Sequence, residues 1–241
     1  MTRARAALLA LALAACALPP QGAGPRSDGL MRQMQSCLAD PGQGGACTIV
    51  APGRGFVVVK DDSPEKPLAW LIVPSNPEVT GMEDPAIFTA PVAGFWREGW
   101  QAGRRLVPVP PADLALAINS EAGRTQNLLH IHISCVDPKV RAAIAAAAIG
   151  RGWAPGPTLA GQDWQARRVD SLDPSPFLLL RELPGAAEAP GLWSLAALAA
   201  PGGGYVLLAG SSRPGAPATA ESLLDETCGD RHGGQPRAHA A

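Results

Sequence analysis

The stretch NLLHIHISC, residues 127–135, holds two of the four histidines in this 241-residue chain. Polar and apolar residues alternate along it, which is the pattern of a β-strand with one face toward a core. We therefore expect His130, His132 and Ser134 to share an open face, with the intervening apolar side chains in the core. Two imidazoles on such a face can form part of a polar surface, bind a metal ion, or catalyse a reaction at phosphorus.

Two polar residues before the histidines have an informative spacing. In AINSEAGRTQ, residues 117–126, Asn119 ends an expected strand, and Gln126 follows a short loop, four residues before His130. This arrangement resembles the histidine-triad superfamily of nucleotide hydrolases and transferases. In that family an Asn precedes a loop, a Gln and a small polar residue contact phosphate, and the motif His-φ-His-φ-His-φ-φ follows. The chain departs from that motif at its third histidine, which is Ser134 here.

A longer string, AINSxxGRTQNxxHIHISC followed by DPxVR, is similar to the CDP-diacylglycerol pyrophosphatase family of bacterial envelopes. FVVVKD, the LIVP strand, the SPFLLL stretch and a cysteine near the C-terminus support the resemblance, which runs roughly from Cys37 to Cys228. It implies a histidine-triad-like fold and hydrolysis of CDP-diacylglycerol to CMP and phosphatidate. It implies no metal and no other cofactor.

The resemblance also implies a covalent route. His132 attacks the phosphorus on the cytidine side to give a cytidylyl-histidine, phosphatidate leaves, and water then releases CMP. His130 orients the site. Ser134, in the place of the third histidine, donates a hydrogen bond to the leaving oxygen.

Four polar residues before the strand are candidates for binding the substrate's phosphates. Asn119, Gln126 and Asn127 are uncharged donors for phosphate oxygens, although Asn and Gln also serve as turn and cap residues. Arg124 is expected to steer the anionic substrate, or else to be a solvated loop arginine.

Other functions remain open at this point. A metal site on the two histidines needs a third ligand, for which Glu83, Asp84 or Cys135 would have to serve. A related enzyme could act on soluble nucleotide pyrophosphates instead of a lipid. A non-catalytic lipoprotein could bind lipid headgroups and leave them intact.

The N-terminus predicts export. Arg3 and Arg5 precede an apolar run at 6–15 that is too short to span a bilayer. Leu13-Ala14-Ala15-Cys16 resembles a bacterial lipobox, in which the cysteine is lipidated; an ordinary cleaved signal peptide is the alternative. We expect a signal peptide at 1–15, lipidated Cys16 with a flexible tether at 16–29, one domain at 30–228 and a disordered tail at 229–241. The expected location is the cell envelope, anchored to the periplasm-facing side of the inner membrane.

Composition and cysteines narrow the class of protein. A net charge of −1 argues against a nucleic-acid partner, and 46% hydrophobic residues suffice for a sizeable core. The exported context favours disulfides. Cys37 and Cys47 enclose a short Gly- and Pro-rich loop and form the simplest pair, which leaves Cys135 for Cys228. A buried free thiol at Cys135 is the alternative.

The pattern along the chain predicts an α+β fold with a mostly antiparallel sheet. Helices are expected at 27–38, at 95–106 and from 138 onward, the last capped by Asp137. Strands or strand-like segments are expected at 56–61, 68–74, 114–120, 127–135, 164–170, 175–183, 191–200 and 205–210.

Overall fold

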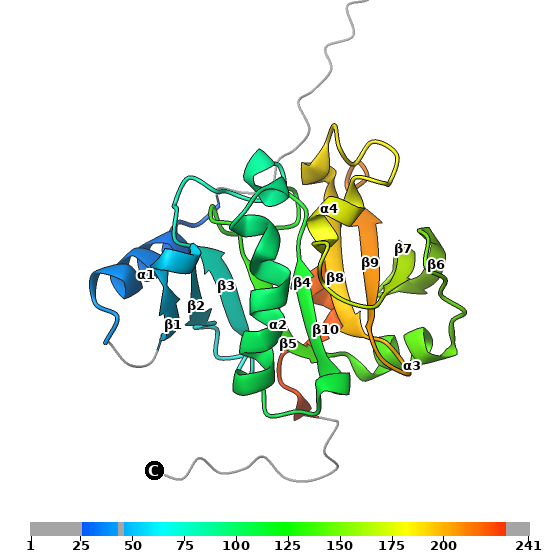
Figure 1. Cartoon of the computed structure of the whole chain (residues 1–241), viewed down its shortest axis with the longest axis horizontal. Helices are drawn as coiled ribbons and strands as arrows, with labels where there is room; N and C mark the ends of the chain where they lie inside the picture. Colours follow the sequence, from blue (N-terminus) through cyan, green and yellow to red (C-terminus); the bar gives the residue numbers. More distant parts are fainter. Residues whose placement is uncertain (1–25, 43–45, 230–241) are drawn as a thin grey trace, which may run out of the picture.

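The computed structural model describes residues 26–42 and 46–229 (Figure 1). One sheet runs through this part of the chain in the order β1-β2-β3-β5-β4-β8-β9-β7-β6, and β10 pairs with β5 off this path. Every strand pair is antiparallel. The predicted α+β class with a mostly antiparallel sheet is confirmed.

The bounds of the main elements are as follows. The strands are β1 (Cys47–Ala51), β2 (Phe56–Lys60), β3 (Trp70–Pro74), β4 (Leu114–Ile118), β5 (Ile131–Val136), β6 (Ala154–Leu159), β7 (Gln162–Val169), β8 (Trp193–Ala199), β9 (Tyr205–Ser211) and β10 (Leu224–Asp225). The helices are α1 (Gly29–Ala39), α2 (Phe95–Leu106), α3 (Pro138–Ala146) and α4 (Pro176–Leu180), and a 3-10 turn, η6 (Ala220–Leu223), precedes β10.

Helix α2 covers one face of the sheet and lies in front of it in Figure 1. Gly99 and Gly103 lie on the buried side of this helix, where an added Cβ would come within 2.8 Å of Leu116 and Ile133 respectively. The two glycines therefore let α2 pack directly on β4 and β5. This rigid backing supports β5, the strand that carries His132.

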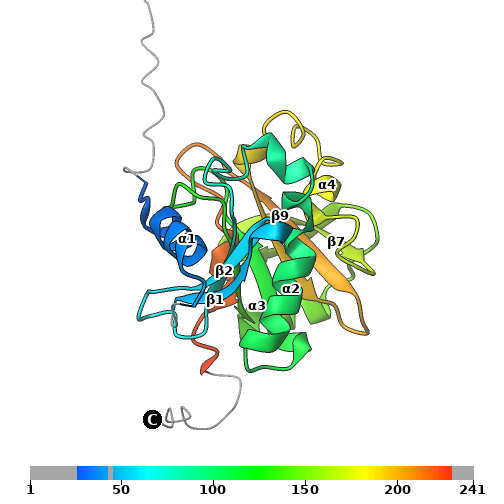
Figure 2. The ribbon, with the colours of Figure 1, turned by 60° about the vertical axis from the view of Figure 1, so that its left-hand side comes forward.

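The opposite face of the sheet is covered by separate pieces. Helix α1 packs on β2 and β3, and α3 packs with η6 over β4 and β8. Figure 2 shows β1 and β2 running between α1 and α2. Between α1 and η6 this face carries His132, so the pocket described below lies on the side of the sheet away from α2.

Two disulfides fasten this second face. Cys37–Cys47 ties α1 to β1, and Cys135–Cys228 ties β5 to the segment after β10. Both predicted pairs are confirmed, and the free-thiol alternative for Cys135 is wrong. The second bridge closes a separation of 93 residues and brings the C-terminal segment to the histidines.

Most predicted elements are found. Helix α2 has the predicted bounds, and the Asp137 side chain accepts hydrogen bonds from the backbone N–H groups of Lys139 and Val140 at the start of α3. The β2–β3 and β8–β9 hairpins are present. No helix among the described residues is both long and apolar enough to cross a bilayer.

Two segments differ from the prediction. Residues 175–183, expected to be strand-like, contain α4, because Ser175 caps Phe177 N and Pro176 takes the first helical position. Strand β6 was not expected, since Pro155 and Pro157 lie within it. Its place at the edge of the sheet tolerates their missing N–H groups.

The ends of the chain lie partly outside the described residues. The lipobox, Cys16, His232 and His239 are all outside them. Within them, ordered structure begins before the expected domain boundary at residue 30: Ser27 pairs with Gln126, and Asn127 N donates to Ser27 O over 3.0 Å.

Candidate active site

His130 and His132 lie in a pocket of about 350 Å³ at the start of β5. The first turn of α1, Lys66 and Glu221 are parts of its wall. The two imidazoles are only 5% and 4% exposed. The prediction of an open face is therefore wrong, because the loop at 61–66 and the C-terminal segment cover it. The residues lining the pocket are Ser27, Gly29, Leu30, Gln33, Asp61, Asp62, Ser63, Lys66, Leu71, Thr125, Gln126, His130, His132 and Glu221.

The register of β5 sets the place of His132. It lies opposite Leu71 on β3 and Ala117 on β4, while Ile131 and Ile133 face the core beneath α2. The predicted alternation is thus confirmed from 131 onward. Strand β5 begins at Ile131, later than predicted, and His130 is the last residue of the preceding loop.

His130 has a fixed tautomer. Its Nδ1 lies 2.7 Å from the carbonyl oxygen of Leu128, and because that oxygen only accepts, Nδ1 carries the proton and Nε2 has a free lone pair. Burial and the neighbouring His132 lower the pKa of His130 from 6.5 to about 4. The ring meets that of His132 edge-on, with centroids 5.0 Å apart. His130 is therefore a neutral imidazole that packs against and positions the next histidine.

This neutral histidine predicts a pH-dependent stability. Between pH 6.5 and about 4 the unfolded chain binds a proton at His130 that the folded chain does not, so the free energy of unfolding falls as the pH falls. Over this pH range we expect the free energy of unfolding of the wild-type protein to fall by on the order of 3 kcal/mol more than that of His130→Gln. Urea unfolding at intervals from pH 7 to pH 4 measures the difference, and parallel curves for the two proteins would contradict the assignment.

His132 lies between two carboxylates. Its Nε2 is 3.4 Å from Glu221 Oε2, and its Nδ1 is 3.6 Å from Glu226 Oε1. Neither ring nitrogen has a hydrogen-bond partner among the described residues. Two buried polar nitrogens without such partners are costly for stability, which is typical of a functional group.

Glu221 is held on several sides. Asn119 Nδ2 donates to its Oε2 over 2.9 Å, and its own backbone N–H donates to Asn119 Oδ1 over 3.0 Å. Lys66 forms an ion pair with its other oxygen. Burial opposes the charge, but His132, Lys66 and Asn119 together hold the pKa of Glu221 at about 2. Asn119, predicted to bind phosphate, thus lies at the site and fixes this carboxylate.

Lys66 supplies a positive charge at the site. Its Nζ lies 3.1 Å from Glu226 Oε2 and 4.0 Å from Asp61 Oδ2, besides the ion pair with Glu221. Burial alone would lower the pKa of Lys66, but the facing carboxylates raise it above its ordinary value. The side chain is therefore an ammonium group at the wall of the pocket.

Sequence reasoning missed Lys66, Glu221 and Glu226. The two glutamates come about 90 residues after His132, and no local pattern links them to it. One signal was available: both lie within eight residues of Cys228, whose partner Cys135 is three residues from His132. The predicted disulfide already implied that this segment lies beside the histidines.

Two predicted site residues are engaged elsewhere. Ser134 Oγ is fully buried and donates to Leu68 O over 2.8 Å, outside the pocket lining, so the expected contact with a leaving oxygen does not fit this geometry. Arg124 is 5% exposed and pairs with Glu83 through both terminal nitrogens. It supports the loop before β5 instead of steering substrate from solvent.

The two amide residues before the histidines differ in position. Gln126 lines the pocket, and its Oε1 accepts a hydrogen bond from Leu30 N in the first turn of α1 over 3.2 Å. Asn127 does not line the pocket, and its Nδ2 donates to Asp28 Oδ1 over 2.7 Å. Gln126 therefore stays a candidate for phosphate binding, whereas Asn127 fastens the segment before α1.

The structure also tests the residues weighed for a metal. Glu83 pairs with Arg124, Asp84 accepts from Ala86 N, and Cys135 is in a disulfide, so none of the three is a free ligand. Asp61, His132 and Glu226 do offer three ligand atoms within 4.8 Å of one another. Lys66, however, already places a positive charge against both carboxylates, and it would repel a divalent cation there.

Activity is therefore expected to survive removal of metal ions. Dialysis against a chelator should leave the rate of the hydrolysis expected from the sequence unchanged within twofold, because the Lys66 ammonium supplies the positive charge. The rate before and after dialysis, with and without added Mg²⁺, Mn²⁺ or Zn²⁺, measures this. Loss of activity that one of these ions restores would instead make Asp61, His132 and Glu226 metal ligands.

Comparison with known proteins identifies the family. Residues 25–232 match the family model described as CDP-diacylglycerol pyrophosphatase. A Yersinia pestis protein named CDP-diacylglycerol pyrophosphatase is 40% identical over 196 residues, which cover 76% of this chain and 75% of that protein.

Solved structures add a weaker likeness. Yeast Ap4A phosphorylase is 14% identical with a TM-score of 0.39, over 64% of this chain and 55% of its own. Its complex with AMP is 13% identical with a TM-score of 0.40, over 76% of this chain and 64% of its own. The match to the family model and the 40% identity are decisive: the chain belongs to the CDP-diacylglycerol pyrophosphatase family.

Proposed function

We propose that this chain hydrolyses CDP-diacylglycerol to CMP and phosphatidate, with His132 as a covalent nucleophile. The observation that carries the proposal is the buried imidazole of His132, which has no hydrogen-bond partner in the described part of the chain and lies in a polar pocket lined by Gln126 and Lys66. The family match supports the substrate.

The pocket lining offers groups that suit an anionic substrate. Gln126 and the first turn of α1 both line the pocket, and the N-terminal end of a helix favours an anion. Lys66 also lines it and now pairs with the Glu221 carboxylate, which Asn119 holds from outside the lining. A substrate phosphate would take over the Lys66 ammonium group from Glu221.

In the first step, His132 Nε2 forms a bond to the cytidine-side phosphorus. The bond from that phosphorus to the bridging oxygen breaks, and its electron pair leaves with the phosphatidate. Glu226 faces Nδ1 at 3.6 Å, so its carboxylate favours the tautomer with the proton on Nδ1, which leaves the Nε2 lone pair for the attack. Water then attacks the phosphorus, the P–N bond breaks with its electron pair returning to Nε2, and CMP and one proton are released.

The lipid substrate also fits the proposed location. We propose that a lipid anchor at Cys16 holds the domain at the membrane, on the strength of the lipobox-like residues 13–16. Anchoring raises the effective concentration of a substrate that lies in the same bilayer.

The direct test compares a lipid with a soluble substrate. We expect CMP release from CDP-diacylglycerol in mixed micelles to exceed release from CDP-choline at least tenfold at equal concentrations. Equal rates would favour an enzyme for soluble nucleotide pyrophosphates. Binding of CDP-diacylglycerol to micelle-bound protein without CMP release would favour a non-catalytic headgroup-binding protein.

A further inference from the structure

Formation of the cytidylyl-histidine and its hydrolysis by water require different catalytic groups. The first step expels a phosphate monoester, whose second proton has a pKa of about 6, so it leaves without being protonated. The second step uses water, whose pKa is about 15.7, so a base that takes its proton accelerates the attack. What the site needs in place of a third histidine is therefore a base for water.

Ser134 is not that base. Its hydroxyl is buried and lies 2.8 Å from Leu68 O and 3.3 Å from Asp225 O, both backbone carbonyls. Lys66 is also excluded, since the facing carboxylates keep it protonated. Glu226 faces Nδ1 of His132, away from the nitrogen that bonds to phosphorus.

Glu221 is the carboxylate on the reacting side. Its Oε2 is 3.4 Å from His132 Nε2, the atom that carries the cytidylyl group. It lines the pocket, and Asn119 holds it at both its backbone N–H and its carboxylate. A phosphoryl group bonded to Nε2 would therefore lie against this carboxylate.

We propose that Glu221 is the general base for hydrolysis of the cytidylyl-histidine, an inference that rests on the proposed function. The water oxygen bonds to phosphorus, its proton passes to the Glu221 carboxylate, and the P–Nε2 bond breaks with its electron pair returning to the ring. CMP leaves, and Glu221 then gives its proton to solvent.

Substrate binding prepares Glu221 for this role. In the free protein, Lys66 and Asn119 hydrogen-bond to the carboxylate and His132 faces it, and these groups keep it a weak base. Substrate phosphate engages the Lys66 ammonium group, which lines the pocket, so the carboxylate loses that part of its stabilisation. Burial is the largest effect that raises the pKa of Glu221. Once the stabilisation is lost, burial makes the carboxylate a stronger base at the stage when water must be activated.

The test is to separate the two steps in Glu221→Gln. On mixing with CDP-diacylglycerol we expect a burst of one phosphatidate per protein, followed by CMP release slowed about 10²- to 10⁴-fold. The cytidylyl adduct should accumulate on His132. Fluoride brings no proton to remove, so it should speed turnover of the adduct and give cytidine 5′-phosphorofluoridate. Glu221→Asp, which keeps a carboxylate, should retain more activity than Glu221→Gln.

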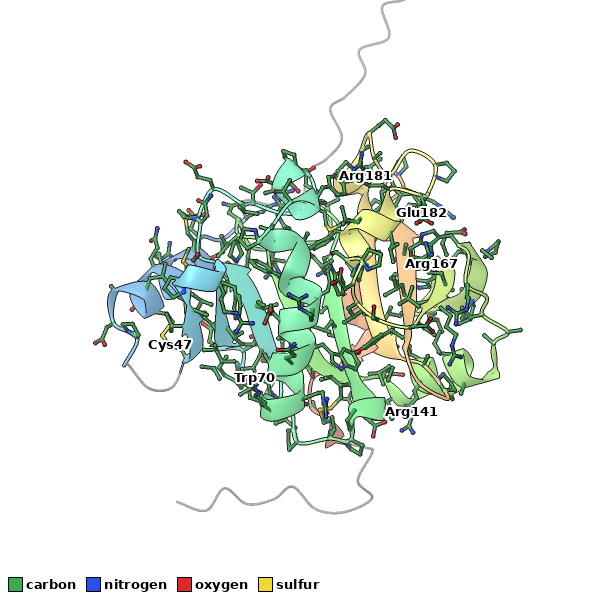
Figure 3. All side chains as sticks on the ribbon, in the orientation of Figure 1. Cys47, Trp70, Arg141, Arg167, Arg181 and Glu182 are labelled. Carbon is green, nitrogen blue, oxygen red and sulfur yellow. A yellow bond between two sulfur atoms is a disulfide. The ribbon has the colours of Figure 1, made fainter. Side chains whose placement is uncertain are left out.

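Glu182→Gln is the matched control. Glu182 is also ion-paired, to Arg167 at 2.6 Å, and Figure 3 shows the pair by β7, away from Trp70 on β3. This variant should behave as wild type.

Three results would decide against Glu221 as the base. The first is CMP release by Glu221→Gln at the wild-type rate. The second is a cytidylyl adduct on His132 that fluoride does not remove. The third is a Glu221→Gln protein that keeps the wild-type melting temperature but gives no burst of phosphatidate. A wild-type protein that releases no CMP would instead remove the proposed function itself.

Discussion

Replacing His132 with alanine is expected to lower the turnover of CDP-diacylglycerol by about 10⁴-fold or more, because the nucleophile is lost and water cannot take its place at the phosphorus. The fold should persist, since the imidazole makes no hydrogen bond with residues 26–42 or 46–229. CMP release under substrate saturation and the midpoint of thermal unfolding measure the two effects.

Lys139→Ala is the control for this experiment. Lys139 is exposed on α3 and does not line the pocket, so the variant should keep the wild-type rate. A His132→Ala protein that still turns over within tenfold of wild type would contradict the role of His132, since no other group would then be needed at the phosphorus.

Removing the Cys135–Cys228 bridge by a double substitution with alanine is expected to lower the free energy of unfolding by about 4–5 kcal/mol, the loop-closure value for its separation of 93 residues. CMP release should fall as well. The bridge holds the segment that carries Glu221 and Glu226 against β5, where β10 pairs with Val136 and Cys135. Urea unfolding and the steady-state rate measure the two effects.

The other disulfide serves as the comparison. Cys37–Cys47 spans only 10 residues and ties α1 to β1, so its removal should cost about 2–3 kcal/mol. It carries neither glutamate of the site. Full activity after loss of the Cys135–Cys228 bridge would contradict the claim that the C-terminal segment completes the site.

The fold was predictable where one local pattern sufficed. The alternation at 131–135 put Ile131 and Ile133 in the core, and the apolar periodicity at 95–106 gave α2 with its observed bounds. The strand predicted at residues 175–183 was wrong, because a short apolar run is compatible with both a strand and a buried helix. The Ser175-Pro176 pair at its start was the overlooked sign of a helix.

The site was predictable only in part. The spacing of Asn119, Gln126, His130 and His132 located it, and three of these four residues line the pocket. Spacing does not reveal whether a polar side chain makes its hydrogen bonds within the fold. For this reason the sequence predicted a catalytic contact for Ser134 that the structure does not support. The hydroxyl is bonded to a backbone carbonyl.

The remaining part of the site depends on long-range pairing. Glu221 and Glu226 approach His132 because β10 joins β5 and Cys228 bonds to Cys135. Lys66 reaches both glutamates from the loop before β3. The contact between β5, the C-terminal segment and the loop before β3 follows from tertiary structure. No periodicity within any one of these segments predicts it.

Mass spectrometry of the protein, quenched seconds after mixing with CDP-diacylglycerol, tests the covalent mechanism most directly. Wild-type protein and Glu221→Gln are digested, and the fragment ions of the peptide with both histidines locate any added mass. We expect a cytidylyl group on His132 that is strongest in Glu221→Gln and absent in His132→Ala. An adduct on His130, whose Nε2 also has a free lone pair, or CMP release with no adduct in either protein, would contradict the mechanism.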